Sequence, residues 1–218
     1  MFAPVFVCVT AVVCLLAAEW ADVAIARAAA KMAAASAFIA LALECGALGS
    51  EYGRVLLAGL VLCWIGDACL LSGGRSRAFL AGIGAFLLGH LAYAAAFARL
   101  GLAGEGLLVG AAALAAFAAL TLRWLWPALP GGFRLPVLAY LVVISAMVVT
   151  AIGASWAGAP WTLLVGAVVF AFSDLFVARD RFVREGFVNA AVGLPAYFGA
   201  QLLLAASIAQ VAATRSAL

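Results

Sequence analysis

The sequence predicts an all-α fold, a bundle of about eight transmembrane helices that forms a single domain over residues 1–218. Composition is the first observation that predicts it. Of all residues, 69% are hydrophobic and only 10% are charged, whereas a soluble domain has roughly 45–50% apolar and about 25% charged residues. Second, apolar runs long enough to cross a bilayer, about 20 residues, follow one another along nearly the whole chain. An ordinary soluble core is excluded, and we expect a multi-pass protein of a bacterial-type inner membrane.

The individual helices follow from the charges and the Gly/Pro clusters that interrupt the apolar runs. The first run has no Lys or Arg before it, unlike a secretory signal peptide, so we interpret it as a transmembrane helix. The second run differs from the others because Arg27 and Lys31 lie at its start and its centre is a run of alanines. The predicted helices cover residues 3–18, 28–47, 55–72, 78–98, 102–122, 135–154, 160–178 and 187–209.

Arginines are distributed unequally between the two ends of this bundle. The connections after the odd-numbered helices carry Arg27, Arg75, Arg77, Arg123, Arg134, Arg179, Arg181 and Arg184. The opposite end carries only Arg54, Arg99 and Arg215. Because Lys and Arg are retained on the cytoplasmic side, we expect both termini to lie outside the cytoplasm. The sequence has no basic tail or basic face that would indicate a nucleic-acid partner.

The sequence also suggests an internal duplication. A shift of 107 residues places Asp67 on Asp174, Arg27 on Arg134 and His90 on Tyr197. The halves would be residues 1–107 and 108–218, in parallel orientation because each holds an even number of helices. Chance similarity is the alternative, since few residues are identical.

Asp67 and Asp174 stand inside apolar runs, where a carboxylate is unexpected. A charged side chain at mid-membrane costs about 2.5–3.5 kcal/mol even on the lenient insertion scale, so such residues usually mark a functional site. The alternative is that each aspartate reaches the interface or bonds to a neighbouring helix.

Other polar side chains occupy the same predicted helices. His90 and Tyr93 are three residues apart, and Tyr197 and Gln201 are four apart, so each pair shares a helix face. With Lys31 and the two aspartates, they predict one buried polar chamber. Taken singly, His90 would be an ordinary core histidine and Lys31 a side chain extending to the interface. The five cysteines lack the spacing of a zinc site or a disulfide framework, and we expect no metal and no cofactor.

Several motifs resemble those of one family. The blocks "GDACLL", "FLAGIGAFLLGHLAYAAAF", "LPVLAY", "FSDLFVARDRF" and "PAYFGAQLLLAAS" are similar to those of the YhhN-type lysoplasmalogenases, over most of the chain from residue 55 onward. Family members often have Lys-Pro where this chain has Lys31-Met32. The resemblance implies a membrane hydrolase that cleaves the vinyl ether bond of a lysophospholipid held within the bilayer. Position by position, it points to Lys31, Asp67, His90, Tyr93, Ser173, Asp174, Tyr197 and Gln201.

The chemistry of a vinyl ether assigns expected roles to these residues. Its outer carbon must be protonated, and water must trap the resulting oxocarbenium ion, so an acid and an ionised carboxylate are needed. We expect Asp67 to be the general acid and Asp174 to hold the water or stabilise the cation, while His90 could exchange roles with either. Tyr93 and Tyr197 would orient these groups by hydrogen bonds. We expect substrate contacts from Lys31, Ser173 and Gln201, and phosphate contacts from Arg75 and Arg181.

Two other classes of protein also use intramembrane aspartates. Intramembrane aspartyl proteases carry Gly-x-Gly-Asp and Tyr-Asp motifs, whereas here Ile65 precedes Gly66-Asp67 and Ser173 precedes Asp174. A proton-coupled transporter remains the better alternative, since carboxylates at a repeat interface are common in such carriers. Against it, the two halves lack helices broken by Pro or Gly at matching positions.

Overall fold

The computed structural model describes residues 2–71 and 77–216. Within these residues, eight helices are long and apolar enough to cross a bilayer. They are α1 (Phe2–Trp20), α2 (Ala24–Glu44), α3 (Glu51–Leu70), α4 (Arg77–Ala98), α5 (Gly104–Leu125), α6 (Gly131–Trp156), α7 (Thr162–Ala178) and α8 (Phe187–Ser216). Three short turns accompany them: the 3₁₀ turns η1 (Ala47–Gly49) and η2 (Trp126–Ala128) and the π-helical turn η3 (Arg179–Val183). The predicted all-α fold class is confirmed.

Local chemistry explains where the observed helix ends differ from the predicted ones. Helix α2 ends at Glu44, three residues before the predicted end, because Gly46 adopts a left-handed conformation (φ 81°) that closes the helix. Helix α3 begins at Glu51, four residues before the predicted start, because the Ser50 hydroxyl accepts a hydrogen bond from the Gly53 amide at 3.0 Å. The predicted helix ends came from the lengths of the apolar runs, and these lengths do not show where a cap begins or ends a helix.

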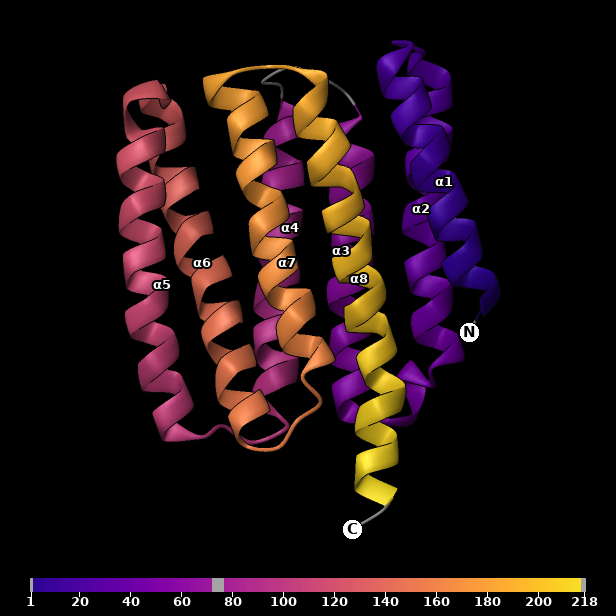
Figure 1. Cartoon of the computed structure of the whole chain (residues 1–218), viewed down its shortest axis with the longest axis vertical. Helices are drawn as coiled ribbons and strands as arrows, with labels where there is room; N and C mark the ends of the chain where they lie inside the picture. Colours follow the sequence, from indigo (N-terminus) through magenta and orange to yellow (C-terminus); the bar gives the residue numbers. More distant parts are fainter. Residues whose placement is uncertain (1, 72–76, 217–218) are drawn as a thin grey trace.

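The helices form three groups across the membrane plane. Helices α3, α4, α7 and α8 occupy the centre, with α1–α2 on one side and α5–α6 on the other (Figure 1). Helix α4 packs against α6, and α8 packs against α2, so the central group is tied to both outer pairs. The two termini lie at the same end of the bundle (Figure 1). At the opposite end, each odd-numbered helix leads into the even-numbered helix that follows it.

The interior and the surface of the bundle are both apolar. Large side chains such as Phe38, Phe170 and Phe198 are fully buried between helices. Others, including Phe6, Leu108 and Leu135, are more than 70% exposed. In a bilayer, lipid chains would cover these exposed side chains, while the helices satisfy their own backbone hydrogen bonds. Helix α5 packs mainly against α6 and is the least buried of the spans found in the described residues.

Candidate active site

A cavity of about 690 Å³ lies between the helices, within the range of roughly 300–1,000 Å³ that is usual for small-molecule sites. All eight described helices contribute to its lining, together with η3. Its outer part is lined near the arginine-rich end of the bundle, by residues such as Glu19, Arg27 and Arg181. Its inner part reaches Asp67, Asp174 and other side chains within the membrane-spanning helices. A polar site therefore lies inside the bundle and extends toward one membrane face.

Asp67 on α3 is held at both carboxylate oxygens. The Lys31 ammonium, from α2, lies 3.1 Å from Oδ1. The Tyr197 hydroxyl, from α8, donates a hydrogen bond of 2.6 Å to Oδ2. Asp67 is only 1% exposed, and Lys31 is the only lysine in the sequence. The two donors favour the ionised form of this carboxylate, while its burial opposes that form.

Asp174 on α7 is held at one oxygen only. The Tyr140 hydroxyl, from α6, donates to Oδ2 at 2.8 Å. His90 Nε2, from α4, lies 3.7 Å from the same oxygen. The Asp174 side chain is 18% exposed and lines the cavity, and no residue in the described ranges bonds to its Oδ1. Asp174 therefore has a free oxygen at the cavity, unlike Asp67.

His90 is fully buried beside Asp174. Its Nδ1 lies 2.6 Å from the Phe86 carbonyl oxygen, which can only accept, so Nδ1 carries a hydrogen atom and donates it. Its Nε2 has no hydrogen-bond partner among the described residues. The nitrogen that remains available for proton exchange therefore points toward Asp174.

Tyr93 and Gln201 lie behind this site and do not line the cavity. The Tyr93 hydroxyl donates to Gln201 Oε1 at 2.8 Å, and Gln201 Nε2 donates to the Tyr197 hydroxyl at 3.2 Å. Tyr197 in turn donates to Asp67. Gln201, which we expected to contact substrate, is thus placed to orient Tyr197, and Tyr93 is placed to orient Gln201.

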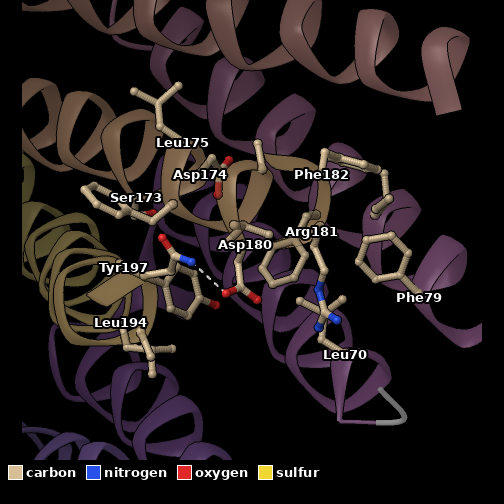
Figure 2. A pocket seen from close by; sticks show the side chains of 18 of the residues that line it. Leu70, Phe79, Ser173, Asp174, Leu175, Asp180, Arg181, Phe182, Leu194 and Tyr197 are labelled. Carbon is tan, nitrogen blue, oxygen red and sulfur yellow. Dashed lines mark hydrogen bonds between the residues drawn. The ribbon is translucent and has the colours of Figure 1, made fainter. Parts of the chain in front are cut away.

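Two further predicted residues line the cavity. The Ser173 hydroxyl donates to the Phe170 carbonyl of its own helix at 2.7 Å, so its proton is already engaged. The Arg181 guanidinium lies over the Phe79 ring at 5.1 Å and has no ion pair or hydrogen bond within the described ranges. Figure 2 shows Ser173, Asp174 and Tyr197 in one part of the site and Arg181 with Phe79 and Phe182 in another. Arg75, the other predicted phosphate contact, lies outside the described residues.

The segment that carries Arg181 is fixed by Asn189 of α8. The Arg179 guanidinium donates to the Asn189 side-chain oxygen. Asn189 Nδ2 donates to Asp180 Oδ1 at 2.7 Å and to the Arg184 carbonyl at 2.8 Å. These bonds hold η3 at the rim of the cavity. Arg27, which also lines the cavity, pairs with Glu19 at 3.2 Å and with Asp22 at 3.4 Å.

Tyr140, like Asn189, is a polar residue of the site that was not predicted from the sequence. It lies within the quoted block "LPVLAY", but nothing near it in the sequence is polar. The available signal was that a tyrosine hydroxyl inside a membrane-spanning helix needs a hydrogen-bond partner.

As for metals, the described residues contain no group of three or more His, Cys, Asp or Glu side chains arranged to hold one.

Comparison with known proteins places the chain in a family. The YhhN family matches residues 26–208. Proteins of Mycobacterium bovis and Mycobacterium tuberculosis, both named lysoplasmalogenase, are 35% identical over 180 residues, which cover 78% of this chain and 67% of each relative. Lysoplasmalogenase TMEM86B of Mus musculus is 37% identical over 153 residues, which cover 68% of this chain and 61% of that protein. No solved structure matches the chain. The protein therefore belongs to the YhhN family.

Proposed function

We propose that this protein is a lysoplasmalogenase, a membrane hydrolase that cleaves the vinyl ether bond of a 1-alkenyl lysophospholipid. The products are a fatty aldehyde and glycerophospho-ethanolamine or glycerophosphocholine. Family membership and the names of its relatives support the reaction class. The observation that carries the proposal is a pair of intramembrane aspartates, Asp67 and Asp174, that line one cavity but have unlike partners.

The surroundings of the two aspartates support a division of roles. Asp174 protonates the outer alkene carbon, since its Oδ1 is free at the cavity. Asp67 stays ionised and stabilises the oxocarbenium ion, since Lys31 and Tyr197 occupy both of its oxygens. This division is the reverse of the one we expected from the sequence. Unlike surroundings that keep one carboxyl protonated and the other ionised are a general way to run acid chemistry at neutral pH.

The remaining steps regenerate the protonated form of Asp174 with a proton from water. Proton transfer from Asp174 to carbon breaks the double bond and leaves an oxocarbenium ion and a carboxylate. Water then adds to the cation and gives its proton to that carboxylate, which forms a hemiacetal. Collapse of the hemiacetal transfers its hydroxyl proton to the glycerol oxygen, breaks the bond between carbon and that oxygen, and releases the aldehyde and the alcohol. His90 Nε2, 3.7 Å from Asp174, can share the proton between turnovers, since such contacts often shorten once substrate is bound.

The two parts of the cavity suit the two parts of a lysophospholipid. Arg181 at the rim has unused hydrogen-bond donors and can bind the phosphate. Apolar side chains such as Phe117, Leu141 and Ile144 line the wall formed by α5 and α6, where an alkenyl chain can be buried. Lys31 also lines the cavity, and its ammonium stays paired with Asp67 in this arrangement.

Substrate choice tests the proposal. Purified protein given 1-alkenyl lysophospholipid should release fatty aldehyde, while the 1-alkyl and 1-acyl lipids should stay intact. An alkyl ether has no electron-rich double bond to protonate, and an ester requires a nucleophile. Turnover should be slower in heavy water, because transfer of a proton to carbon is slow. Plasmalogen with a second acyl chain should be a much poorer substrate, since that chain must enter the same bundle.

The 1-acyl lipid and a vesicle uptake assay distinguish the proposed function from its two alternatives. Release of fatty acid from the acyl lipid at a comparable rate would identify an esterase and contradict the proposal. Uptake of a solute or lipid into vesicles without release of aldehyde would support the transporter alternative instead.

A further inference from the structure

Tyr140 is the one side chain in the described residues that donates a hydrogen bond to Asp174. It extends from α6, lines the cavity, and donates to Oδ2 at 2.8 Å. Its ring is also 5.2 Å from the His90 ring, centre to centre. The hydroxyl of Tyr140 and Nε2 of His90 therefore meet at the same carboxylate oxygen.

A carboxyl group that delivers a proton to carbon must be held in one orientation. The torsion that rotates an aspartate carboxyl has a broad energy profile, so packing and hydrogen bonds must fix it. Asp67 is fixed by donors on both oxygens. Asp174 is partly exposed to the cavity and has Tyr140 as its one fixed donor in the described chain. Without that bond, the two oxygens of Asp174 could exchange places.

We infer that Tyr140 is a positioning residue whose hydroxyl holds Oδ2 of Asp174 and thereby keeps Oδ1 facing the double bond of the substrate. This inference rests on the proposed function. Tyr140 transfers no proton to the substrate, and it acts on the rate only through Asp174. The alternative is a structural role, in which Asp174 merely provides the Tyr140 hydroxyl with a partner.

The chain contains a matched control for the structural role. Tyr52 is a buried tyrosine, whereas Tyr140 is half-buried, and the Tyr52 hydroxyl lies 2.6 Å from the Ser207 hydroxyl. It does not line the cavity. Tyr140→Phe and Tyr52→Phe therefore remove the same atom and one hydrogen bond each, at the site and away from it.

Aldehyde release from 1-alkenyl lysophospholipid by the purified full chain measures the effect. Tyr140→Phe should lower kcat by about 10- to 100-fold, the usual effect of misplacing a catalytic group, with little change in KM. Tyr52→Phe should keep the activity of the unchanged protein. Equal activity of the two variants would overturn the inference while the proposed function stands. Absence of aldehyde release by the unchanged protein would instead contradict the proposed function.

A double variant separates positioning from a general effect on folding. If Tyr140 acts through Asp174, adding Tyr140→Phe to Asp174→Asn should cause no further loss of kcat. If the fold-loss of kcat in the double variant equals the product of the losses in the two single variants, Tyr140 acts independently of Asp174, which would overturn the inference. If Tyr140→Phe does not fold, 3-fluorotyrosine at position 140 keeps the shape and changes the strength of the donor. It should alter kcat several-fold, whereas the same replacement at Tyr52 should not, and equal effects would again contradict the inference.

Discussion

At the scale of single residues, loss of the contact between Lys31 and Asp67 should lower both the stability and the activity of the protein. Their 3.1 Å ion pair lies inside the bundle, with 13% of the Lys31 side chain and 2% of the Asp67 side chain exposed. Lys31→Met keeps the length of the side chain but leaves a buried carboxylate without its counter-charge. Removing one partner of a buried ion pair destabilises the folded protein. The melting temperature in detergent should therefore fall by about 5 °C or more. Aldehyde release should fall by about 10- to 100-fold.

A second substitution distinguishes loss of the pair from loss of the lysine itself. Adding Asp67→Asn to Lys31→Met removes the unpaired charge, so stability should recover while activity stays low. The control is Arg99→Met, which breaks an exposed pair with Glu51 and should have little effect on stability. A double variant less stable than Lys31→Met would contradict a charge-pairing role.

The polar residues themselves were easier to predict than their partners. Asp67, Asp174, His90 and Lys31 stand out in the sequence because charged and titratable groups are costly inside a membrane. Their pairing depends on helices that are distant in sequence, since Asp67 is bonded from α2 and α8. Nothing in the spacing indicates that Tyr140 is the donor to Asp174, because that contact depends on how α6 packs against α7.

At the scale of structural elements, the turn η3 should control substrate affinity. Asn189 contacts Arg179, Asp180 and Arg184, and so fixes the segment that carries Arg181. Asn189→Ala removes these bonds and should let the turn move. Because Arg181 is proposed to bind the phosphate, KM for the lysophospholipid should rise by about 5- to 10-fold, with a smaller change in kcat.

The opposite end of the same helix pair supplies the control. Thr162 of α7 donates to Gln210 of α8 at 2.6 Å, away from the cavity. Thr162→Ala should leave KM unchanged. A kcat that falls with unchanged KM in Asn189→Ala would mean that η3 serves the chemical step and not phosphate binding.

The order and approximate extent of the helices could be predicted, because apolar length sets them. The π-helical form of η3 could not be predicted, because it depends on bonds from Asn189, which lies in the next helix. The predicted site was likewise spread over several helices, and only their packing brings Asp67 and Asp174 to one cavity.

At the scale of the whole molecule, the partners of the two aspartates follow a common pattern. Each aspartate receives one partner from the helix before it: Lys31 of α2 for Asp67, and Tyr140 of α6 for Asp174. The other partner comes from the last helix of the other half: Tyr197 of α8 for Asp67, and His90 of α4 for Asp174. Two parallel halves with the same order of helices would produce this pattern of contacts. The duplication stays a prediction, and a site built between halves would require both of them.

Orientation in the membrane is the remaining property of the whole chain that can be tested. The arginine-rich connections lie at the end of the bundle where the cavity is lined by Arg27 and Arg181, and the two termini lie at the other end. With eight arginines at the first end and three at the other, retention of positive charge should keep the first end in the cytoplasm. A reporter fused after Leu218 should therefore read as non-cytoplasmic, and one inserted near Arg75 as cytoplasmic.

Replacing Arg123 and Arg134, which do not line the cavity, should weaken this preference without loss of activity in correctly inserted protein. A cytoplasmic C-terminus would contradict the assigned orientation, and the cavity would then receive its lysophospholipid head groups from the opposite leaflet.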